Sequence, residues 1–304
     1  MTVGTRGSRM SRIQTDMIVQ KLKELLPDAD IEIKVIRTIG DLITQKPLFM
    51  FERKGIFERE IDRAVTRGEV DFAVHSLKDV PTTIPQKTVI VAVPERGSPH
   101  DVLVSRDGLG LKDLPEGAVI GTSSPRRMAQ TRYVRPDLKV RPIRGNVDTR
   151  VKKLERGWYD ALILAEAGLR RLGLQDRITE RLSLEDFTPA PGQGALAVIA
   201  NKDNKGVVDI LKQLNHQPSM AAALAERAFI RAVGGGCKVP LGALAQSKGD
   251  KLSLFASVLS PDGSARVQAS NVGDLSSPED LGLKVAQEVL KLGGGELVQR
   301  GKRV

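Results

Sequence analysis

Apolar and polar residues alternate with two different periods along the first third of the chain. Short apolar stretches predict strands around Val3, at 31–36 and at 70–75. The segments between them have the wider spacing of helices. Ser8 or Ser11 is suited to cap the first helix, and Gly68 is suited to end the second. This strand–helix–strand repetition predicts a largely parallel α/β sheet.

The same pattern starts again after a Pro/Gly connection at 94–99. Further strands are predicted at 102–104, 118–122, 139–143 and 161–165. Ser124 suits the N-cap of a helix and Pro125 its first position. Asn146 is placed to cap the next helix, which Gly157 ends. A second connection at 188–194 then leads into an apolar strand at 195–200.

A chain that leaves one α/β lobe, builds another and returns has the plan of a two-lobed binding protein. We therefore expect two periplasmic-binding-protein-like α/β lobes with paired crossovers, followed by a small α+β C-terminal domain. That last domain is predicted from a helix ending at Val233, two strands and a final helix at 278–292. The expected domains are 1–95 with 194–214, 99–189, and 217–304.

Composition narrows the class of protein. The chain of 304 residues has a single cysteine, which excludes an internal disulfide and favours a reducing compartment. One cysteine and three histidines supply no metal-ligand spacing. No apolar run reaches the length of a membrane span, and the first ten residues do not resemble a secretory signal. These features predict a cytoplasmic protein without a metal.

Positive charge is concentrated in one part of the chain. The net charge is +10, and residues 126–156 hold eleven Lys and Arg against three acids. Such density indicates an anionic partner, either a nucleic acid or a small polyanion, unless it is only the solvated face of a helix. Aromatic residues make up 3% of the chain, too few for a platform that stacks single-stranded bases.

Arginines recur where strands end and helices begin. The first turns after Ser124 and Asn146 both offer free backbone N–H groups beside arginines, as an anion site requires. The turns at 6–8 and 78–79 also follow strands, and ligands of α/β sheets collect at the carboxyl ends of strands. Surface charge is the alternative for each arginine taken singly.

Two residues are candidates for chemistry. Cys237 follows three glycines and is a buried apolar thiol, a nucleophile or a covalent attachment point. Asp79 follows a buried strand beside Lys78, where it is either a proton donor or a turn aspartate that bonds its own backbone before Pro81.

Several motifs together resemble the porphobilinogen deaminase family, also called hydroxymethylbilane synthases. They run in family order across nearly the whole chain: Gly4-Thr-Arg-Gly-Ser8, Lys54-Gly-Ile-Phe57, Val74-His-Ser-Leu-Lys-Asp79, Gly121-Thr-Ser-Ser-Pro-Arg-Arg127, Arg144-Gly-Asn-Val-Asp-Thr-Arg150, Ala161-Leu-Ile-Leu-Ala-Glu-Ala-Gly-Leu169, Pro191-Gly-Gln-Gly-Ala195, Ala225-Glu-Arg-Ala228 and Gly235-Gly-Cys237-Lys-Val-Pro240. Each motif is weak alone, and their combination is specific.

The resemblance implies a three-domain transferase of tetrapyrrole (haem) biosynthesis, and we expect it to be a monomer. Such an enzyme condenses four porphobilinogen molecules head to tail, expels ammonia at each step and releases 1-hydroxymethylbilane by hydrolysis. It also implies a dipyrromethane cofactor held in thioether linkage, a role that falls on Cys237. Asp79, with Lys78 beside it, then protonates the leaving amine and stabilises cationic pyrroles.

The resemblance further implies contacts with cofactor and substrate. The cofactor contacts are Lys78, Thr122, Ser123, Ser124, Arg126, Arg127, Arg144, Gly145 and Asn146. The substrate contacts are Arg6, Ser8, Phe57, Arg144 and Arg150. The segment 49–56, expected to form a lid over the cleft, departs from the family pattern. A non-catalytic binder of an organic anion and a nucleic-acid binder are the alternatives.

Overall fold

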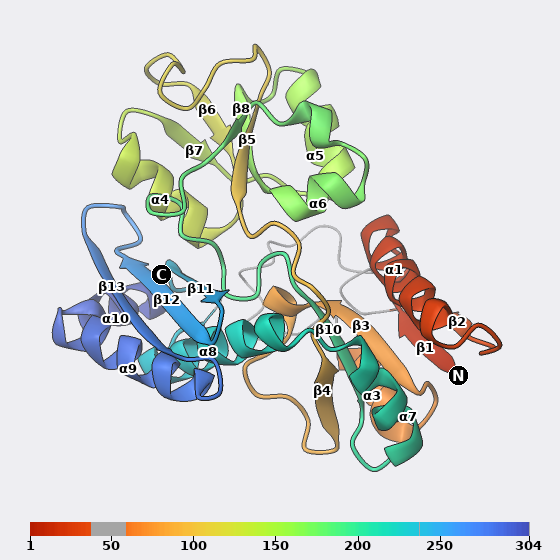
Figure 1. The fold of residues 1–304 in the computed structure, drawn as a ribbon. Coiled ribbons are helices and arrows are strands. Elements are labelled where there is room, and N and C mark those ends of the chain that lie inside the picture. Colours follow the sequence, from red (N-terminus) through yellow and green to blue (C-terminus); the bar gives the residue numbers. More distant parts are fainter. Residues whose placement is uncertain (38–58, 237, 304) are drawn as a thin grey trace. The chain divides into compact units, whose positions relative to one another are not determined.

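The computed structural model describes residues 1–37, 59–236 and 238–303, which form two compact units (Figure 1). Unit 1 comprises Met1–Gly97 and Ala195–Ala223, and unit 2 comprises Ser98–Gly194 and Leu224–Val304. The chain leaves unit 1 after Gly97 and returns after Gly194, so the paired crossovers expected from the sequence are confirmed.

The sheet of unit 1 has the strand order β2-β1-β3-β10-β4. Its strands are β1 (Thr2–Thr5), β2 (Glu32–Val35), β3 (Phe72–Ser76), β4 (Thr88–Ala92) and β10 (Leu196–Asn201). β1 pairs in parallel with β2 and β3, whereas β10 is antiparallel to β3 and β4. The antiparallel strand is the one that enters after the second crossover.

Helices cover both faces of this sheet. Ile18 and Leu22 of α1 (Arg9–Leu25) share a core with Val3 and Phe72, to which α7 (Lys205–Leu211) contributes Leu211. On the other face α3 (Arg59–Arg67) packs through its own core cluster, and β3 runs on into the short helix η2 (Leu77–Asp79). The layers bury the sheet, because alternate side chains of each strand point to opposite faces.

Unit 2 repeats this plan in the sheet order β7-β6-β8-β5-β9. The strands are β5 (Asp101–Ser105), β6 (Val119–Gly121), β7 (Lys139–Arg141), β8 (Ala161–Ala165) and β9 (Glu180–Arg181). β6 is parallel to β7 and β8, and β5 is antiparallel to β8 and β9. The antiparallel strand again lies next to a crossover, here the first one.

Each helix of this lobe follows a strand of the sheet. The helices are α4 (Pro125–Val134), α5 (Val147–Glu155) and α6 (Glu166–Arg171), with η3 (Gln175–Arg177) as a short turn. Leu154 of α5 and Leu169 of α6 pack with Val102 and Leu162 of the sheet. The side chains of Leu103 and Ile120 belong to a separate cluster of buried residues.

The C-terminal part is an antiparallel sheet with helices. Its strands are β11 (Leu241–Lys248), β12 (Lys251–Leu259) and β13 (Arg266–Asp274), in that order. Its helices are α8 (Gln217–Val233), α9 (Pro278–Lys291) and α10 (Gly294–Arg303), and η4 (Lys212–Leu214) precedes α8. A small residue is required at Gly282, because a Cβ there would lie 2.4 Å from the carbonyl oxygen of Ala225.

The predicted fold class is therefore confirmed: two α/β lobes and a small α+β domain. Sequence periodicity missed the strands β4, β9 and β11, the helix α10 and the short helices η2 and η3 of the described chain. The proposed division into three domains stays a prediction.

Within unit 2, Arg132 Nη1 donates to the carbonyl oxygen of Pro261 at 3.0 Å, and the Arg266 guanidinium lies 4.4 Å from the Tyr133 ring. Such contacts join the second lobe to the C-terminal sheet.

Candidate functional site

Hydrogen bonds of side-chain hydroxyl groups stabilise the turn between β6 and α4. Ser124 is the N-cap of α4, and its Oγ accepts from the backbone N–H of Arg127 at 3.5 Å. Ser123 Oγ donates to the carbonyl oxygen of Ile143 at 2.7 Å, while the N–H of Ile143 donates back to it at 2.9 Å. Buried Thr122 accepts from the N–H of Ser124 at 3.3 Å. The predicted cap and its proline at the first helical turn are thus confirmed.

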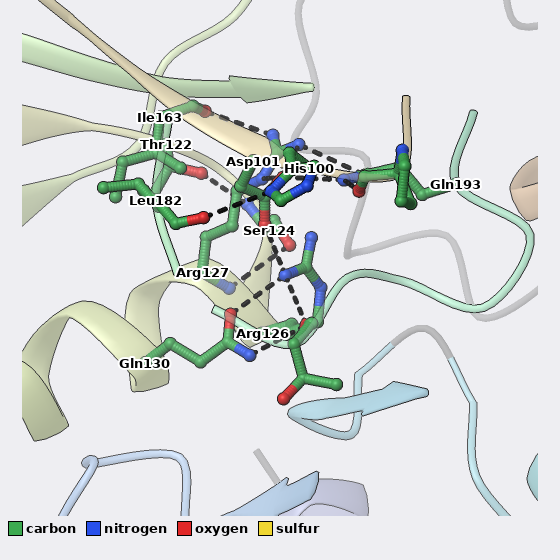
Figure 2. Close-up of polar contacts among 12 residues, drawn as sticks. His100, Asp101, Thr122, Ser124, Arg126, Arg127, Gln130, Ile163, Leu182 and Gln193 are labelled. Carbon is green, nitrogen blue, oxygen red and sulfur yellow. Dashed lines mark hydrogen bonds and ion pairs between the residues drawn. The ribbon is translucent and has the colours of Figure 1, made fainter. Parts of the chain in front are cut away.

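Two arginines of this first turn point at one carboxylate. Figure 2 shows the guanidinium groups of Arg126 and Arg127 converging on Asp101, the first residue of β5. Arg126 Nη1 donates to Asp101 Oδ2 at 2.6 Å, and Arg127 donates to Oδ1 through Nε at 3.0 Å and Nη2 at 2.7 Å. All three side chains are buried, that of Asp101 completely.

The charge of Asp101 is retained despite this burial. Burial alone would raise the pKa of Asp101, but the charges of Arg126 and Arg127 and their hydrogen bonds hold that pKa well below its usual range. Gln193 adds a further donor, since its Nε2 lies 2.9 Å from Asp101 Oδ1. Asp101 is therefore an ionised counter-ion shared by two cations.

Arg150 brings a third guanidinium close to this pair. Burial and the nearby charge of Arg127 lower the pKa of Arg150 to about 10. Its Nε donates to the carbonyl oxygen of Gly145 at 2.8 Å, and no carboxylate of the described chain forms an ion pair with it. Arg126 and Arg127 thus share the one carboxylate of this group, and with Arg150 beside them a surplus of two positive charges remains.

The turn before α5 completes this positive region. Asn146 is the N-cap of α5 as predicted, but its side chain makes no capping hydrogen bond. Gly145 has φ +109°, a conformation that favours glycine, and a Cβ there would lie 2.7 Å from the Thr149 methyl carbon. The carbonyl oxygen of Arg144 accepts from Lys153 Nζ at 2.9 Å.

Unit 1 holds the candidate proton donor. Asp79 ends η2, directly after β3, and its side chain is exposed. The N–H of Leu77 donates to the carbonyl oxygen of Ala195 at 3.0 Å, which ties this turn to the returning strand. Lys78 beside it is partly buried. Asp79 is therefore available to a ligand rather than committed to the core.

The turn after β1 also carries the residues expected there. Ser8 is the N-cap of α1 and accepts from the N–H of Ser11 at 3.2 Å, and Arg6 is partly buried between β1 and this cap. Since β1 and β3 are parallel neighbours, Arg6 and Asp79 both follow the carboxyl ends of strands at one edge of the sheet.

The structure thus gathers the predicted residues into two groups. Arg126, Arg127 and Arg150 belong to unit 2, and Arg6, Ser8, Lys78 and Asp79 belong to unit 1. Cys237, Phe57 and the segment 49–56 lie outside the described residues. Individual roles in binding cofactor or substrate stay predictions.

Sequence reasoning missed Asp101 and Gln193. Asp101 is a single acid at the start of an apolar strand, and it lies 25 residues from Arg126 and 92 from Gln193 in the chain. No local pattern connects residues so far apart. The available signals were the excess of positive charge in a segment with two adjacent arginines and, for Gln193, its place in the motif Pro191-Gly-Gln-Gly-Ala195.

Comparison with known proteins identifies the family. Residues 1–209 match the family described as "Porphobilinogen deaminase, dipyromethane cofactor binding domain", and residues 220–291 match "Porphobilinogen deaminase, C-terminal domain". The chain belongs to the porphobilinogen deaminase family. The resemblance seen in the sequence motifs is thereby confirmed.

Full-length relatives support the same assignment. The porphobilinogen deaminase of Desulforudis audaxviator is 45% identical over 300 residues, which cover 99% of this chain and 97% of the relative. That of Thermus thermophilus is 45% identical over 299 residues, 98% of each chain. A probable porphobilinogen deaminase of Nitrosopumilus maritimus is 45% identical over 295 residues, 97% of this chain and 94% of the relative.

Solved structures of binding proteins show a remote likeness. A periplasmic binding protein with high arginine specificity from Salmonella typhimurium has a TM-score of 0.40 at 12% identity, covering 70% of this chain and 90% of that one. A lipoprotein of the YaeC family from Enterococcus faecalis has a TM-score of 0.42 at 16% identity, with the same coverage.

The residues present fit the dipyrromethane cofactor of the family. Two pyrrole rings that each carry an acetate and a propionate bring four carboxylates, and guanidinium groups at a helix N-terminus suit such a load. The surplus charge around Arg127 and Arg150 is available for them. In addition, Nε of Arg126 is buried without a hydrogen-bond partner among the described residues. An incoming carboxylate would satisfy such a donor.

Proposed function

We propose that this chain condenses four porphobilinogen molecules head to tail, expels one ammonia at each step and releases 1-hydroxymethylbilane by hydrolysis. The observation that carries the proposal is the surplus of positive charge around Arg126, Arg127 and Arg150, within the part of the chain that matches the cofactor domain of the family. It suits a substrate and a growing product whose every ring carries two carboxylates.

When bound, dipyrromethane supplies the electron-rich pyrrole carbon to which the first substrate ring is joined. Asp79 donates a proton to the amine that leaves from each porphobilinogen, and its carboxylate then lies near the developing pyrrole cation. A preorganised charge of this kind contributes on the order of 3 kcal/mol to transition-state stabilisation. The exposed position of Asp79 in η2, directly after β3, supports this role, since a ligand can reach the side chain there.

The arginines bind and orient the carboxylates. Arg126 and Arg127, with the capped turn at Thr122, Ser123 and Ser124, are assigned to the cofactor, together with Arg144, Gly145, Asn146 and Lys78. Arg6, Ser8, Phe57, Arg144 and Arg150 are assigned to incoming substrate. Charge-assisted, often bidentate bonds from guanidinium groups hold a carboxylate in one direction, as an ordered condensation requires.

Cys237 is assigned to the attachment of the cofactor. Its thiol sulfur bonds to the aminomethyl carbon of the first porphobilinogen, and ammonia leaves with the proton of the thiol. A second porphobilinogen joins with loss of another ammonia. Gly235 and Gly236 on one side and Lys238 on the other frame this position in the sequence.

The proposal also covers the reaction class, the cellular location, the oligomeric state and the metal requirement of the enzyme. The enzyme is a transferase of tetrapyrrole biosynthesis that works as a cytoplasmic monomer and needs no metal. No described helix combines the length and hydropathy that a membrane span requires. Among the described side chains, no group of three or more His, Cys, Asp or Glu is arranged to hold a metal ion.

Intact mass under denaturing conditions tests the function. Protein made in cells that supply porphobilinogen should carry an adduct of two porphobilinogen units less two ammonia, and Cys237→Ser should lack it. Asp79→Asn should keep the adduct and lose about two to four orders of magnitude in turnover, because the proton donor is gone.

Asp28→Asn is the matched control for this measurement. Asp28 is also an exposed aspartate of unit 1, beyond the end of α1, and its replacement should leave adduct and turnover unchanged. An unmodified wild-type protein that merely binds organic anions would contradict the enzyme function and favour the non-catalytic binder. Undiminished turnover of Asp79→Asn would remove Asp79 from its role.

A further inference from the structure

We propose that Asp101 is a positioning residue for the cofactor: it fixes the direction of the Arg126 and Arg127 guanidinium groups before the carboxylates of dipyrromethane arrive. The inference rests on the proposed function, because it assigns those arginines to the cofactor. No family motif given for this chain contains Asp101, and its carboxylate accepts from Arg126, Arg127 and Gln193.

The contacts of Asp101 leave little freedom to either arginine. Oδ1 accepts from Arg127 Nε, from Arg127 Nη2 and from Gln193 Nε2, at distances of 3.0, 2.7 and 2.9 Å. Oδ2 accepts from Arg126 Nη1 at 2.6 Å. Arg127 is therefore held by the edge between Nε and Nη2, and Arg126 is held by its Nη1 end.

Other acceptors hold Arg126 at the same Nη1 end and Arg127 at its remaining nitrogen, Nη1. Arg126 Nη1 also lies 2.9 Å from Gln130 Oε1 and 2.9 Å from the carbonyl oxygen of Thr188. Arg127 Nη1 donates to the carbonyl oxygen of Ile163 at 3.1 Å. Arg126 Nε, in contrast, is buried without a hydrogen-bond partner among the described residues. Arg126 is thus fixed through Nη1, and its Nε is left for a ligand.

The charge of Asp101 also keeps Arg126 and Arg127 together. Burial lowers the pKa of Arg126, and the neighbouring charge of Arg127 lowers it further, whereas Asp101 opposes both effects. With Asp101 ionised, the group of Arg126, Arg127 and Asp101 has a net charge of +1, and the two arginines stay packed together. Without it, two uncompensated guanidinium groups would repel each other inside the lobe, and the pair would separate or take up solvent.

Gln193 links the Asp101 carboxylate to the chain segments at both crossovers. Its Nε2 donates to Asp101 Oδ1 (Figure 2). The same nitrogen lies 2.8 Å from the carbonyl oxygen of Pro99. Asp101 follows the first crossover by a few residues, and Gln193 lies in the second. The carboxylate that orients the arginines is consequently fixed by two distant segments of chain. Such support is what a preorganised binding site needs.

Loading of the cofactor-free protein tests the proposal. Apoprotein from cells that make no porphobilinogen is mixed with increasing porphobilinogen, and the adduct is followed by intact mass. We expect Asp101→Asn to need about tenfold more porphobilinogen, or more, for half-loading, because its arginines are no longer aligned. Asp101→Glu keeps the charge but displaces it by one methylene, so its loading should lie between wild type and Asp101→Asn.

Glu166→Gln separates positioning from a loss of stability. Glu166 is also a buried acid of unit 2 that accepts from two arginines and a serine, and it shares no partner with Asp101. This variant should unfold at a lower denaturant concentration and still load like wild type. Wild-type loading by folded Asp101→Asn, or equal loading defects in Asp101→Asn and Glu166→Gln at matched stability, would overturn the proposal.

Two further results can still be told apart from a failure of the positioning role: an Asp101→Asn variant that does not fold, and a wild-type protein that acquires no adduct. If Asp101→Asn does not fold, Asp101→Glu decides: weaker loading at near wild-type stability supports positioning, and unchanged loading overturns it. If the wild-type apoprotein acquires no adduct at any porphobilinogen concentration, the proposed function itself fails. Failure of the positioning role alone appears as a wild type and an Asp101→Asn variant that load equally.

Discussion

At the scale of single residues, buried carboxylates such as that of Glu166 are stabilised by several hydrogen bonds at once. Glu166 is 1% exposed and accepts from Ser98 Oγ at 2.6 Å, from Arg170 Nε at 2.7 Å and from Arg181 Nη2 at 2.6 Å. Burial alone would raise the pKa of Glu166, but these hydrogen bonds, with that of Arg181 foremost, lower it to about 2. Its carboxylate therefore stabilises the folded state whenever it is ionised.

This arrangement predicts how stability depends on pH. The folded-state pKa of about 2 lies below the ordinary value of 4.5, so the stabilisation is complete above pH 4.5 and is lost as the pH falls towards 2. Glu166→Gln should lower the unfolding free energy by roughly 3 kcal/mol at pH 7, with the difference from wild type shrinking below pH 4.5. Urea unfolding at several pH values measures it.

The exposed ion pair of Glu155 with Arg177 is the control for this experiment. Their side chains are 44% and 54% exposed, and solvent screens such pairs, so Glu155→Gln should change stability by less than about 1 kcal/mol. A difference between wild type and Glu166→Gln that stayed constant from pH 7 to pH 3 would show that the ionised carboxylate is not the source of the effect.

At the scale of elements, two hairpin turns of the same sheet have different surroundings. Gly249 lies between β11 and β12 and Gly263 lies between β12 and β13, with φ of +61° and +77°. A Cβ on Gly249 would meet nothing within 4 Å. One on Gly263 would lie 2.8 Å from the carbonyl oxygen of Ala129 and 2.9 Å from the backbone nitrogen of Tyr133, both in α4. The second turn therefore packs directly on the helix that carries Arg126 and Arg127.

This contact predicts unequal effects of the same substitution. Gly249→Ala should cost about 1–2 kcal/mol, because only the left-handed backbone is strained. Gly263→Ala carries the same strain and must also displace α4, which adds about 1–3 kcal/mol. Chemical denaturation of both variants gives the comparison. Equal losses of stability would mean that the turn does not press against α4.

At the scale of the whole molecule, charge and connectivity both bear on function. The net charge of +10 attracts a substrate that carries two carboxylates and one ammonium group. The chain crosses between its units after Gly97 and Gly194, and residues 98–194 form one compact unit with 224–304. The arginines of the second lobe thus belong to the same unit as the described part of the C-terminal sheet and its helices.

The net charge predicts a salt effect on substrate capture. Raising the ionic strength from about 0.05 to 0.5 M should lower kcat/KM roughly two- to tenfold and change kcat much less, because salt screens the attraction that precedes binding. Steady-state kinetics in sodium chloride measures this, with sucrose at equal viscosity as the control. A kcat/KM independent of salt would contradict electrostatic capture.

Much of the fold could be predicted because its signals are local. Neighbouring residues identified Ser124 as an N-cap and Ser8 as one of two candidates with Ser11, and Ser8 and Ser124 both make capping bonds. The missed elements lacked such signals. β9 has two residues, and β11 is a Leu/Ala-rich stretch whose strand character depends on its pairing with β12. Tertiary pairing decided what local periodicity left ambiguous.

The sequence by itself determined the family, the alternation of strands and helices, the surplus of positive charge and the candidates Asp79 and Cys237. All of these depend on residue type and short-range order. Only the tertiary structure decided how that charge is distributed: Asp101 lies against Arg126 and Arg127, while Arg150 has no carboxylate partner in the described chain. Neutralisation of a buried charge depends on which groups lie within a few ångströms of it, and the packing of distant segments sets those distances.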